Sequence, residues 1–546
     1  MNGVLIALLV VPTAAGLLGL LLGRRVAPAL NVTAALATLV LAVLLLLEVE
    51  HGAKIAPVDI QEEWIPALGI SFHIAIDGLN AVLVTMTAFA WFLGTWWSLR
   101  DKELATPTYF LLLGLGQTAV LGAFVAQDLM LFVLCFDLML LPFVLITAQA
   151  STWDGPGLSP AIKLLVYTLV GSLLMLVASV ALAILTAKAS GNNVTFEVAT
   201  LSAGALEPGT QRWILLAFLA AFLIKMPVVP LHGWFADAYR AMPLPALAIF
   251  AAVLSKVAAY GMLKLALPIL PDAVVDWRVA LVVIALVSII YGSLCAFTTN
   301  EPRLILGYSS IAQLGFILLG ISSLDPAGAQ GAILQSVTHA LVVVPAIILV
   351  ALVSERAGGV ERLDQLGGLA RRAPVLTAIF LVVALCWLAM PGTGNFVAEY
   401  LVLLGQWRLS PWATIIASLG VVLAAFYALR LMIGALQNAR GAAVPEDAPE
   451  IGRFDAAVLG TAVGALVLLA LVPQLGLNPG EAAARQAVGS PRAVYESERI
   501  ASGAQPTNAT DADILREAII QGNTPPGQTA VEGEPPADES QVVTPK

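Results

Sequence analysis

Four ionisable side chains lie deep inside long apolar stretches of this sequence: Asp137, Lys225, Lys256 and Glu399. Each lies too far from the ends of its stretch to be explained as a flanking charge. A charge held at mid-bilayer depth costs about 2.5–3.5 kcal/mol even on the lenient insertion scale. Such residues are rare, usually face a protein interior or a wet cavity, and often mark ion pathways. Two bases and two acids inside a helical bundle therefore indicate a route for protons or cations.

Lys225 opens the segment KMPVVPLHGWFADA (225–238), whose two prolines remove backbone donors and disturb a helix. The freed carbonyl groups need partners, which neighbouring helices, side chains or water can supply, so a lysine beside this break can be wetted. Asp137 lies mid-span in DLMLFVLCFDLMLLP (128–142) and is the natural partner of a buried lysine. The two residues could relay a proton, or they could form a static ion pair that fixes helix packing. Asp128, at the edge of the same stretch, is expected to be an interfacial residue or a helix cap.

Lys256 lies roughly twelve residues into its apolar stretch, which is too deep for its charge to reach the interface by snorkelling. Lys264 and Lys163 lie near the ends of their stretches, and snorkelling is expected for both. Glu399 follows the Pro/Gly-rich break in PGTGNFVAEYLVLLG (391–405) by about two helical turns. It could be the final acceptor of a relay, or it could hydrogen-bond to the broken backbone.

Histidines offer a further carrier, because a neutral imidazole can pass a proton between its two nitrogens. His339, in QSVTHALVVVPA, is either such a carrier or a satisfied core residue, and His232 just past the break near Lys225 is similar. His51 and His73 are expected outside the membrane. Four polar residues on one helix could order water or bridge helices: Tyr308, Ser309, Ser310 and Gln313.

The composition indicates a membrane protein. The 546 residues are 59% hydrophobic and 12% charged, with a mean hydropathy of +0.91, whereas a soluble globular protein is nearer 25% charged. The absence of a basic block argues against nucleic-acid binding. The three cysteines are far apart in apolar runs without a CxxC pair, which argues against a metal or iron–sulfur site built by this chain alone. No convincing dinucleotide fingerprint is present, so we expect this chain to bind no cofactor.

Fourteen stretches approach the roughly 20 apolar residues that a membrane-spanning helix needs, and an all-α polytopic membrane protein is therefore expected. Their approximate positions are 3–22, 28–48, 78–99, 107–124, 127–148, 161–187, 213–235, 243–265, 276–297, 303–322, 328–353, 374–406, 411–435 and 455–473. Two stretches, 213–235 and 374–406, are interrupted by Pro and Gly. Broken spans at matching places in two halves indicate inverted repeats with an ion site near the midplane.

The Lys/Arg bias of the loops places the N-terminus outside, with Arg24, Arg100 and Arg240 in cytoplasmic loops and the C-terminus outside as well. From about Pro479 the chain is rich in Pro, Gly, Thr and acids, which predicts a solvated, largely disordered tail. A short helix over 511–520 is an option within it.

Eight motifs occur together and in order, and they resemble those of subunit M of bacterial respiratory complex I, the proton-translocating NADH:quinone oxidoreductase. The resemblance covers most of residues 60–435 and excludes the tail. The matching stretches are EEWIPALGISFHIAIDGLN (62–80), AIKLLVYTLVGSLLML (161–176), LIKMPVVPLHGWFADAY (223–239), LSKVAAYGMLK (254–264), RLILGYSSIAQLGFILLGI (303–321), SVTHAL (336–341), ERLDQLGGLARRAP (361–374) and PGTGNFVAEYLVLLG (391–405).

The resemblance implies an antiporter-like fold of fourteen helices with two inverted five-helix repeats and one proton channel. It implies five segments: helices 1–3 (1–100), the first repeat (101–265), the second repeat (266–435), a last transmembrane helix (436–478) and the tail (479–546). It also implies relay roles for five residues, which are Asp137, Lys225, Lys256, His339 and Glu399.

The same resemblance implies a setting in the bacterial inner membrane, between antiporter-like subunits L and N and beside small membrane subunits. NADH, FMN, iron–sulfur clusters and quinone are then expected in partner subunits of the respiratory chain. The hypothesis that follows is that quinone reduction elsewhere weakens the Asp137–Lys225 pair. A proton then moves through water to Lys256, near His339, and toward Glu399.

The chain departs from the family pattern at three positions. Asp137 is one methylene shorter than the usual glutamate, so its reach to Lys225 is expected to need water or a backbone shift. Tyr239 and Gln313 stand where histidines are common, which weakens a histidine relay and leaves a water-based one.

Related subunits share the implied fold but differ from this chain at individual positions. Subunits L and N and the large subunits of sodium/proton antiporters usually have lysine where this chain has Glu399, which favours subunit M. No long lateral amphipathic helix is predicted after the last span, which argues against subunit L. Two other readings remain: an antiporter or membrane-bound hydrogenase-type subunit, and a structural scaffold with inert ion pairs.

Overall fold

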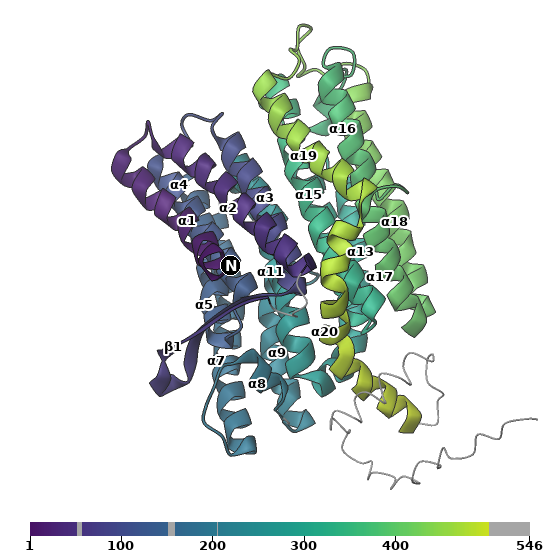
Figure 1. The fold of residues 1–546 in the computed structure, drawn as a ribbon. Coiled ribbons are helices and arrows are strands. Elements are labelled where there is room, and N and C mark those ends of the chain that lie inside the picture. Colours follow the sequence, from purple (N-terminus) through teal and green to yellow (C-terminus); the bar gives the residue numbers. More distant parts are fainter. Residues whose placement is uncertain (52–56, 151–158, 205, 502–546) are drawn as a thin grey trace, which may run out of the picture. The chain divides into compact units, whose positions relative to one another are not determined.

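The computed structural model describes residues 1–51, 57–150, 159–204 and 206–501 (Figure 1). Its larger compact unit is Met1–Arg492, and of the second unit the structure describes residues 493–501. Within the described part, twelve helices are long and apolar enough to cross a membrane. The predicted class, a helical polytopic membrane protein, is confirmed.

The first part of the chain packs four long helices and a short hairpin. These are α1 (Asn2–Leu22), α2 (Ala27–His51), β1 (Val58–Ile65), β2 (Ile70–Ile76), α3 (Gly78–Ser98) and α4 (Pro107–Val125). The next elements are α5 (Leu129–Leu138), α6 (Leu141–Ala150), α7 (Pro160–Ser190), α8 (Val198–Ser202), α9 (Pro208–Lys225), α10 (Phe235–Ala241), α11 (Leu244–Gly261) and α12 (Leu267–Ile269). A π-helical turn, Met262–Ala266, joins α11 to α12.

The remaining helices complete the bundle. They are α13 (Pro271–Thr298), α14 (Pro302–Ser322), α15 (Pro326–Arg356), α16 (Pro374–Trp387), α17 (Gly394–Leu409), α18 (Pro411–Met432), α19 (Arg453–Leu471) and α20 (Gln474–Ala501). Many of these helices begin with proline, which has no N–H to leave unsatisfied in the first turn. Aspartate side chains also cap two of these helices. Asp128 accepts hydrogen bonds from amides in the first turn of α5, and Asp325 accepts one from an amide in the first turn of α15.

Both predicted breaks are present. Helix α9 ends at Lys225 and α10 begins only at Phe235, while α16 ends at Trp387 and α17 begins at Gly394. A third break, which the sequence did not predict, lies at residues 139–140, between the end of α5 at Leu138 and the start of α6 at Leu141. Pro142 explains it, because a proline cannot donate to the carbonyl four residues earlier.

The number of spans stays a prediction. The two predicted spans without a counterpart among the twelve long helices are the two broken ones, α9–α10 and α16–α17. The inverted repeats and the segment boundaries also remain predictions.

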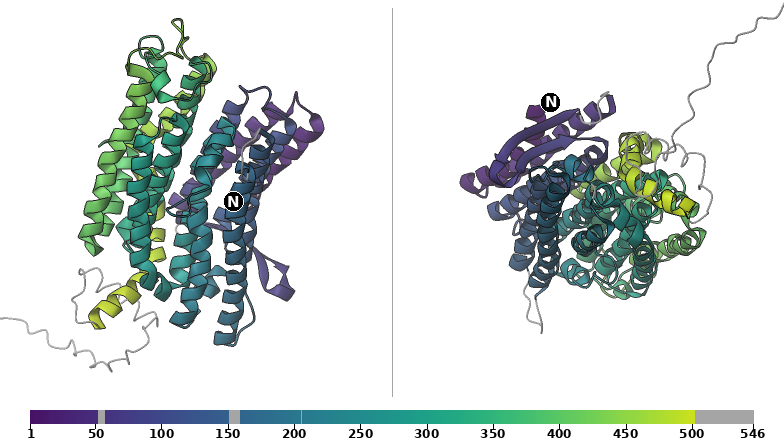
Figure 2. Two further views of the ribbon diagram at one scale, coloured as in Figure 1. Left: turned by 180° about the vertical axis from the view of Figure 1, so that it is seen from behind. Right: turned by 90° about the horizontal axis from the view of Figure 1, so that it is seen from below.

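The buried centre of the larger unit consists of α11, α14 and α15. The most apolar window of α11 and the residues that follow it is 100% buried, and those of α14 and α15 are 94% buried. In α1, α2 and α19 the corresponding share is about a third. Helix α11 packs against α15, α3 and α9 (Figures 1 and 2). The helices that carry Lys256 and His339 are therefore among the most buried of the described helices.

The expectation of a purely helical protein missed one feature, an antiparallel hairpin. Strands β1 and β2 pair with Val58 opposite Ile76 and Gln61 opposite His73 (Figure 1). The alternating apolar residues of ISFHIAI (70–76) were its sequence signal.

The prediction of a disordered tail from residue 479 was wrong for its first part. Helix α20 continues to Ala501, with Pro479 and Pro491 inside it. Buried residues recur every fourth position from Gly476 to Val488, so α20 has one apolar and one polar face. The suggested helix over 511–520 lies outside the described residues.

Candidate functional site

Lys225 and Asp137 are in direct contact. Lys225 is the last residue of α9, its side chain is 3% exposed, and its Nζ lies 3.2 Å from Oδ1 of Asp137. The Asp137 side chain is 36% exposed and stands at the break between α5 and α6. Of the two expected ways for the shorter aspartate to reach Lys225, water or a backbone shift, the direct contact beside the break between α5 and α6 favours the backbone shift.

Phe136 holds the same ammonium on two further sides. Lys225 Nζ lies 3.4 Å from the centroid of the Phe136 ring and donates a hydrogen bond to the Phe136 carbonyl. An aromatic face and a peptide oxygen both stabilise the charged form. Neither group accepts a proton at physiological pH. Of these contacts only Asp137 can take the proton from Lys225.

Lys256 and His339 form the second buried pair. Lys256 on α11 is 0% exposed and His339 on α15 is 2% exposed. Lys256 Nζ lies 2.9 Å from His339 Nδ1 and donates to the Ala251 carbonyl at 2.9 Å. Among the described residues no carboxylate lies within ion-pair distance of Lys256. Two bases thus share one contact, in which a single proton can lie on either nitrogen.

The side chains of Gln313 and Gln335 connect Glu399 by hydrogen bonds toward this pair. Its Oε1 accepts from Gln313 Nε2 at 3.1 Å, and Gln313 Oε1 in turn accepts from Gln335 Nε2. Gln335 and His339 stand one turn apart on the same face of α15, since residues four apart on a helix are neighbours. Gln313 stands where histidine is common in the family, and its side chain forms a hydrogen-bonded bridge between Glu399 and Gln335.

Buried atoms without partners surround this bridge. Glu399 Oε2, Gln335 Oε1 and both amide atoms of Asn395 make no hydrogen bond. Buried polar atoms are normally satisfied, and where protein groups do not satisfy them ordered water does. The α14–α15–α17 contact is therefore suited to hold water beside Glu399.

Aromatic rings separate the two lysine pairs. The Phe136 ring packs on Phe222, with centroids 5.7 Å apart, and Phe132 packs on Tyr260, with centroids 6.4 Å apart. Phe132 also contacts Phe222. The structure thus brings together Lys225 with Asp137, and Lys256 with His339 and the bridge to Glu399. It leaves an apolar aromatic cluster between the two groups.

The two lysines that were expected to snorkel both have a carboxylate partner, which the sequence did not predict. Lys163 Nζ lies 2.6 Å from Oδ2 of Asp237. Lys264 Nζ lies 2.7 Å from Oδ2 of Asp77. Both carboxylates lie far away in the sequence, so residue spacing alone could not reveal the pairs.

The other predicted polar residues have mostly structural partners. Asp128 is the N-cap of α5, as predicted. Ser309 and Ser310 hydrogen-bond to their own helix, and Tyr239 contacts Ser310 across the α10–α14 interface. The His232 ring packs edge-on against Tyr291, and its Nδ1 is buried without a partner.

His73 lies in the hairpin, outside the long helices as predicted. Its Nδ1 lies 2.5 Å from Oε2 of Glu197, and its Nε2 lies 2.8 Å from Oδ1 of Asp59. The hydrogen bond to Glu197 raises the pKa of His73 above its ordinary 6.5, against an opposing effect of burial. Protonated His73 therefore ties β2 to the loop before α8.

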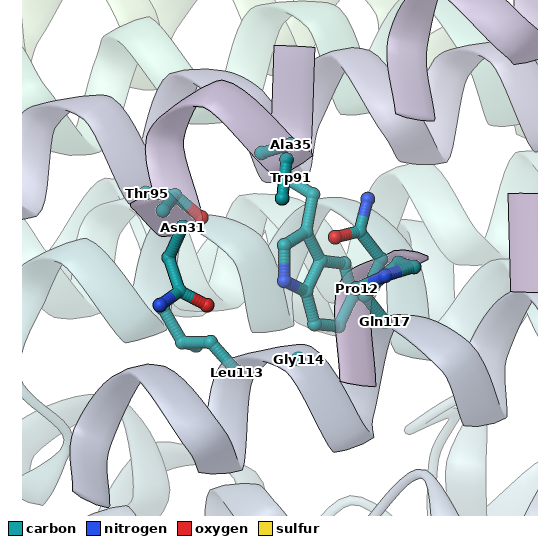
Figure 3. Close-up of a pocket in the computed structure, with 9 residues that line it drawn as sticks. Pro12, Asn31, Ala35, Trp91, Thr95, Leu113, Gly114 and Gln117 are labelled. Atoms are coloured by element: carbon teal, nitrogen blue, oxygen red, sulfur yellow. The ribbon is translucent and has the colours of Figure 1, made fainter. Parts of the chain in front are cut away.

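A small polar cavity lies apart from these residues, among α1 to α4 (Figure 3). Its volume is about 10 Å³, room for about one water molecule. Trp91 Nε1, Thr95 Oγ1 and Gln117 Nε2 are buried there without partners. A larger cleft of about 850 Å³ lies where α3, α11 and α15 end or begin, and Arg100, Arg303 and Glu355 line it.

A family model described as "NADH:quinone oxidoreductase/Mrp antiporter, TM" matches residues 126–425. This range contains all five predicted relay residues. NADH-quinone oxidoreductase subunit M from Pseudomonas aeruginosa is 34% identical over 420 residues, which cover 76% of this chain and 81% of the relative.

Two solved structures have the same fold. A chain of respiratory complex I from Thermus thermophilus with bound NADH superposes with a TM-score of 0.79 at 28% identity, covering 89% of this chain and 99% of that chain. A chain of the Mrp complex from Dietzia sp. gives a TM-score of 0.78 at 22% identity, covering 89% and 97%. The second likeness establishes the fold alone.

Proposed function

The chain belongs to the NADH:quinone oxidoreductase/Mrp antiporter transmembrane family, and on that premise we propose that it is the subunit-M-type, proton-translocating membrane subunit of an NADH:quinone oxidoreductase. The observation that carries the proposal is the set of buried ionisable groups in mutual contact. Lys225 touches Asp137, Lys256 touches His339, and Glu399 is linked toward His339 by amides. A static bundle would be held at lower cost by apolar side chains.

The first step of the proposed relay is the loosening of the Asp137–Lys225 contact. Quinone reduction elsewhere in the complex would change the electrostatics or hydration at Asp137, which is the more exposed partner. Lys225 then keeps only the ring and carbonyl of Phe136, which stabilise its charge but accept no proton. Its proton leaves once water reaches the ammonium.

The second step carries the proton past the aromatic cluster to Lys256. Water must enter between Phe132, Phe222 and Tyr260 for this transfer, so the cluster acts as the barrier in the resting state. His339 Nδ1 can share the arriving proton with Lys256 Nζ. Gln335 and Gln313 carry no charge, but they orient water toward Glu399, the proposed last acceptor.

The cleft of about 850 Å³ is a candidate inlet for protons from the cytoplasm. It opens beside the basic residues Arg100 and Arg303, which the Lys/Arg bias places on the cytoplasmic side. This orientation puts the hairpin and the C-terminal end of the chain on the outer side of a bacterial inner membrane.

The proposed role is non-redox. We expect NADH, FMN, iron–sulfur clusters and quinone to be held by partner subunits. The neighbours in the membrane would be the antiporter-like subunits L and N and small membrane subunits. The complex I and Mrp structures support a place within a multisubunit membrane complex.

An antiporter subunit that exchanges sodium and protons is the second candidate, favoured by the likeness to the Mrp complex. The glutamate at position 399 and the similarity to subunit M relatives favour the oxidoreductase.

The test uses membranes from cells that carry Lys225→Ala on the chromosome. Loss of NADH:quinone turnover, with NADH oxidation by an artificial acceptor retained, would support coupled proton transfer at Lys225. Lys188→Ala, on an exposed lysine of α7, is the matched control and is expected to leave both rates unchanged. Normal turnover and normal acidification in Lys225→Ala would instead favour the antiporter or an inert scaffold.

A further inference from the structure

The face of α11 that carries Lys256 continues as a line of ionisable and hydroxyl groups toward the hairpin end of the bundle. Tyr260 follows Lys256 by four residues, one helical turn, and Lys264 follows by four more in the π-helical turn. Single π-helical turns inside helices occur often at functional sites. The relay proposed above uses the Tyr260 ring as part of the aromatic barrier, but it uses neither the Tyr260 hydroxyl nor Lys264.

The hydroxyl of Tyr260 is buried without a hydrogen bond. The residue is 1% exposed, and its ring packs on Phe124 with centroids 5.3 Å apart. The Phe124 carbonyl accepts a hydrogen bond from Asn80, and Asn80 in turn accepts from the Asp77 amide, so the Tyr260 ring lies beside these two residues. A buried phenol without a partner is unusual, because tyrosine hydroxyls normally find one when buried.

Asp77 and Asn80 form a polar platform whose side chains are held in place by hydrogen bonds to the backbone. Asp77 Oδ1 caps α3 by accepting from the amides of residues 79 and 80, each at 2.9 Å. Asn80 Nδ2 donates to the carbonyls of Ala75 and Phe124 at 2.9 Å and 3.0 Å. The platform therefore ties the end of β2, the start of α3 and the end of α4 together.

The other oxygen of Asp77 faces Lys264, and this pair borders solvent. Asp77 Oδ2 lies 2.7 Å from Lys264 Nζ, with the side chains 12% and 20% exposed. Exposure thus rises along the line, from Lys256 at 0% through Tyr260 at 1% to the Asp77–Lys264 pair. A gradient from a dry base to a wetted ion pair is the arrangement that proton release requires.

We propose that Tyr260, Asp77 and Lys264 form a second outlet, beside the route through Glu399, by which the proton of Lys256 reaches the hairpin end of the bundle. The proposal rests on the proposed function, since it needs Lys256 to carry a proton. In this structure the outlet is closed, because the Lys256 ammonium points the other way, to Ala251 and His339. Swinging of the lysine side chain from His339 toward Tyr260 opens it.

The transfer balances in charge and protons. The Lys256 ammonium gives a proton to the Tyr260 oxygen, directly or through one water, while the Tyr260 hydroxyl proton passes to the Asp77 carboxylate. Lys256 becomes a neutral amine, tyrosine is unchanged, and Asp77 becomes a neutral acid. Lys264 then loses its counter-charge, which favours release of the Asp77 proton to solvent.

The experiment uses the whole complex, reconstituted in liposomes, with Tyr260→Phe in this chain. This change removes only the oxygen and keeps the ring on Phe124. Tyr109→Phe is the matched control, because Tyr109 is also a buried tyrosine with an unpartnered hydroxyl but lies on α4 away from the line. Asp77→Asn is the second variant, since asparagine keeps the helix cap and removes the proton acceptor.

Both variants are expected to lower coupled NADH:quinone turnover and acidification by about twofold, because the route through Glu399 remains, and to change the solvent deuterium isotope effect. Tyr109→Phe is expected to match the parent complex. A loss of turnover with an unchanged isotope effect would assign Tyr260 a packing role and overturn the outlet. Normal pumping in both variants, with Lys256→Met inactive, would overturn the outlet and leave the proposed function standing. If Lys256→Met also pumped normally, the proposed function itself would fail.

Discussion

Lys256 and His339 face each other at 2.9 Å in the least exposed part of the bundle, on two helices that are almost wholly buried. The contact joins two bases from segments 83 positions apart in the sequence. Gln335, one turn before His339, continues the contact toward Glu399 through Gln313. A proton on Lys256 therefore has His339 in direct contact and a hydrogen-bonded series of amides that leads toward Glu399.

Substitution at His339 is predicted to slow the relay without abolishing it. His339→Gln keeps an acceptor for Lys256 but cannot hold a proton charge. We expect coupled NADH:quinone turnover to fall by about tenfold, less than the roughly hundredfold or more that a positioned proton carrier typically contributes, because glutamine still accepts from Lys256. His232→Gln is the control histidine, because its ring contacts Tyr291 and neither lysine. Equal rates in the two variants would remove His339 from the relay.

The amide bridge is predicted to be needed for the last transfer. Gln313→Leu leaves the buried Glu399 without its hydrogen-bond donor, so coupled turnover should fall strongly. Gln313→His restores a group that donates a hydrogen bond and carries a proton, and it should retain activity. The comparison is made as NADH:quinone turnover in membranes, with assembly checked by NADH oxidation through an artificial acceptor. An active leucine variant would show that Glu399 works without the bridge.

Phe136 is predicted to matter through its ring face. In Phe136→Leu the Lys225 ammonium loses a cation–π contact worth about 0.5–2 kcal/mol, which corresponds to a change of roughly twofold to thirtyfold in coupled turnover. Phe143→Leu removes a ring of the same size that packs on Trp91 and Phe250 instead. The prediction fails if the two variants have the same turnover.

The hairpin is predicted to loosen as the pH rises. The folded pKa of His73 is raised, chiefly by its hydrogen bond to Glu197, so its contribution to stability is fully present below the unfolded value of 6.5. That contribution is lost as the pH rises through the folded pKa. Hydrogen exchange of the β2 amides between about pH 6 and about pH 9, corrected for intrinsic rates, should show falling protection. His73→Asn should flatten this dependence, and an unchanged slope would contradict the assignment.

The sequence predicted the broken helices and the Lys225–Asp137 pair because prolines and mid-span charges carry strong local costs. It did not predict the break after Asp137, although Pro142 was its signal, because the surrounding residues are uniformly apolar. Gln335 was missed because one amide in an apolar helix has no periodic signature. Asp77 and Lys264 were missed as partners because 187 positions separate them.

Helix α20 shows a different limit of sequence reasoning. Pro479 and Pro491 and the low hydropathy suggested disorder, yet buried residues at every fourth position keep the segment helical. The hairpin was likewise hidden by the expectation of helices on both sides. In each case a partner surface that the sequence does not display decided the local structure.

The central claim is that protons cross the membrane through the buried bases of this chain. Its most direct test is the ratio of protons translocated to NADH oxidised by the reconstituted complex with Lys256→Met in this chain. The account predicts that coupled turnover and acidification both collapse while NADH oxidation by an artificial acceptor persists. An unchanged ratio at an unchanged rate of quinone reduction would contradict it.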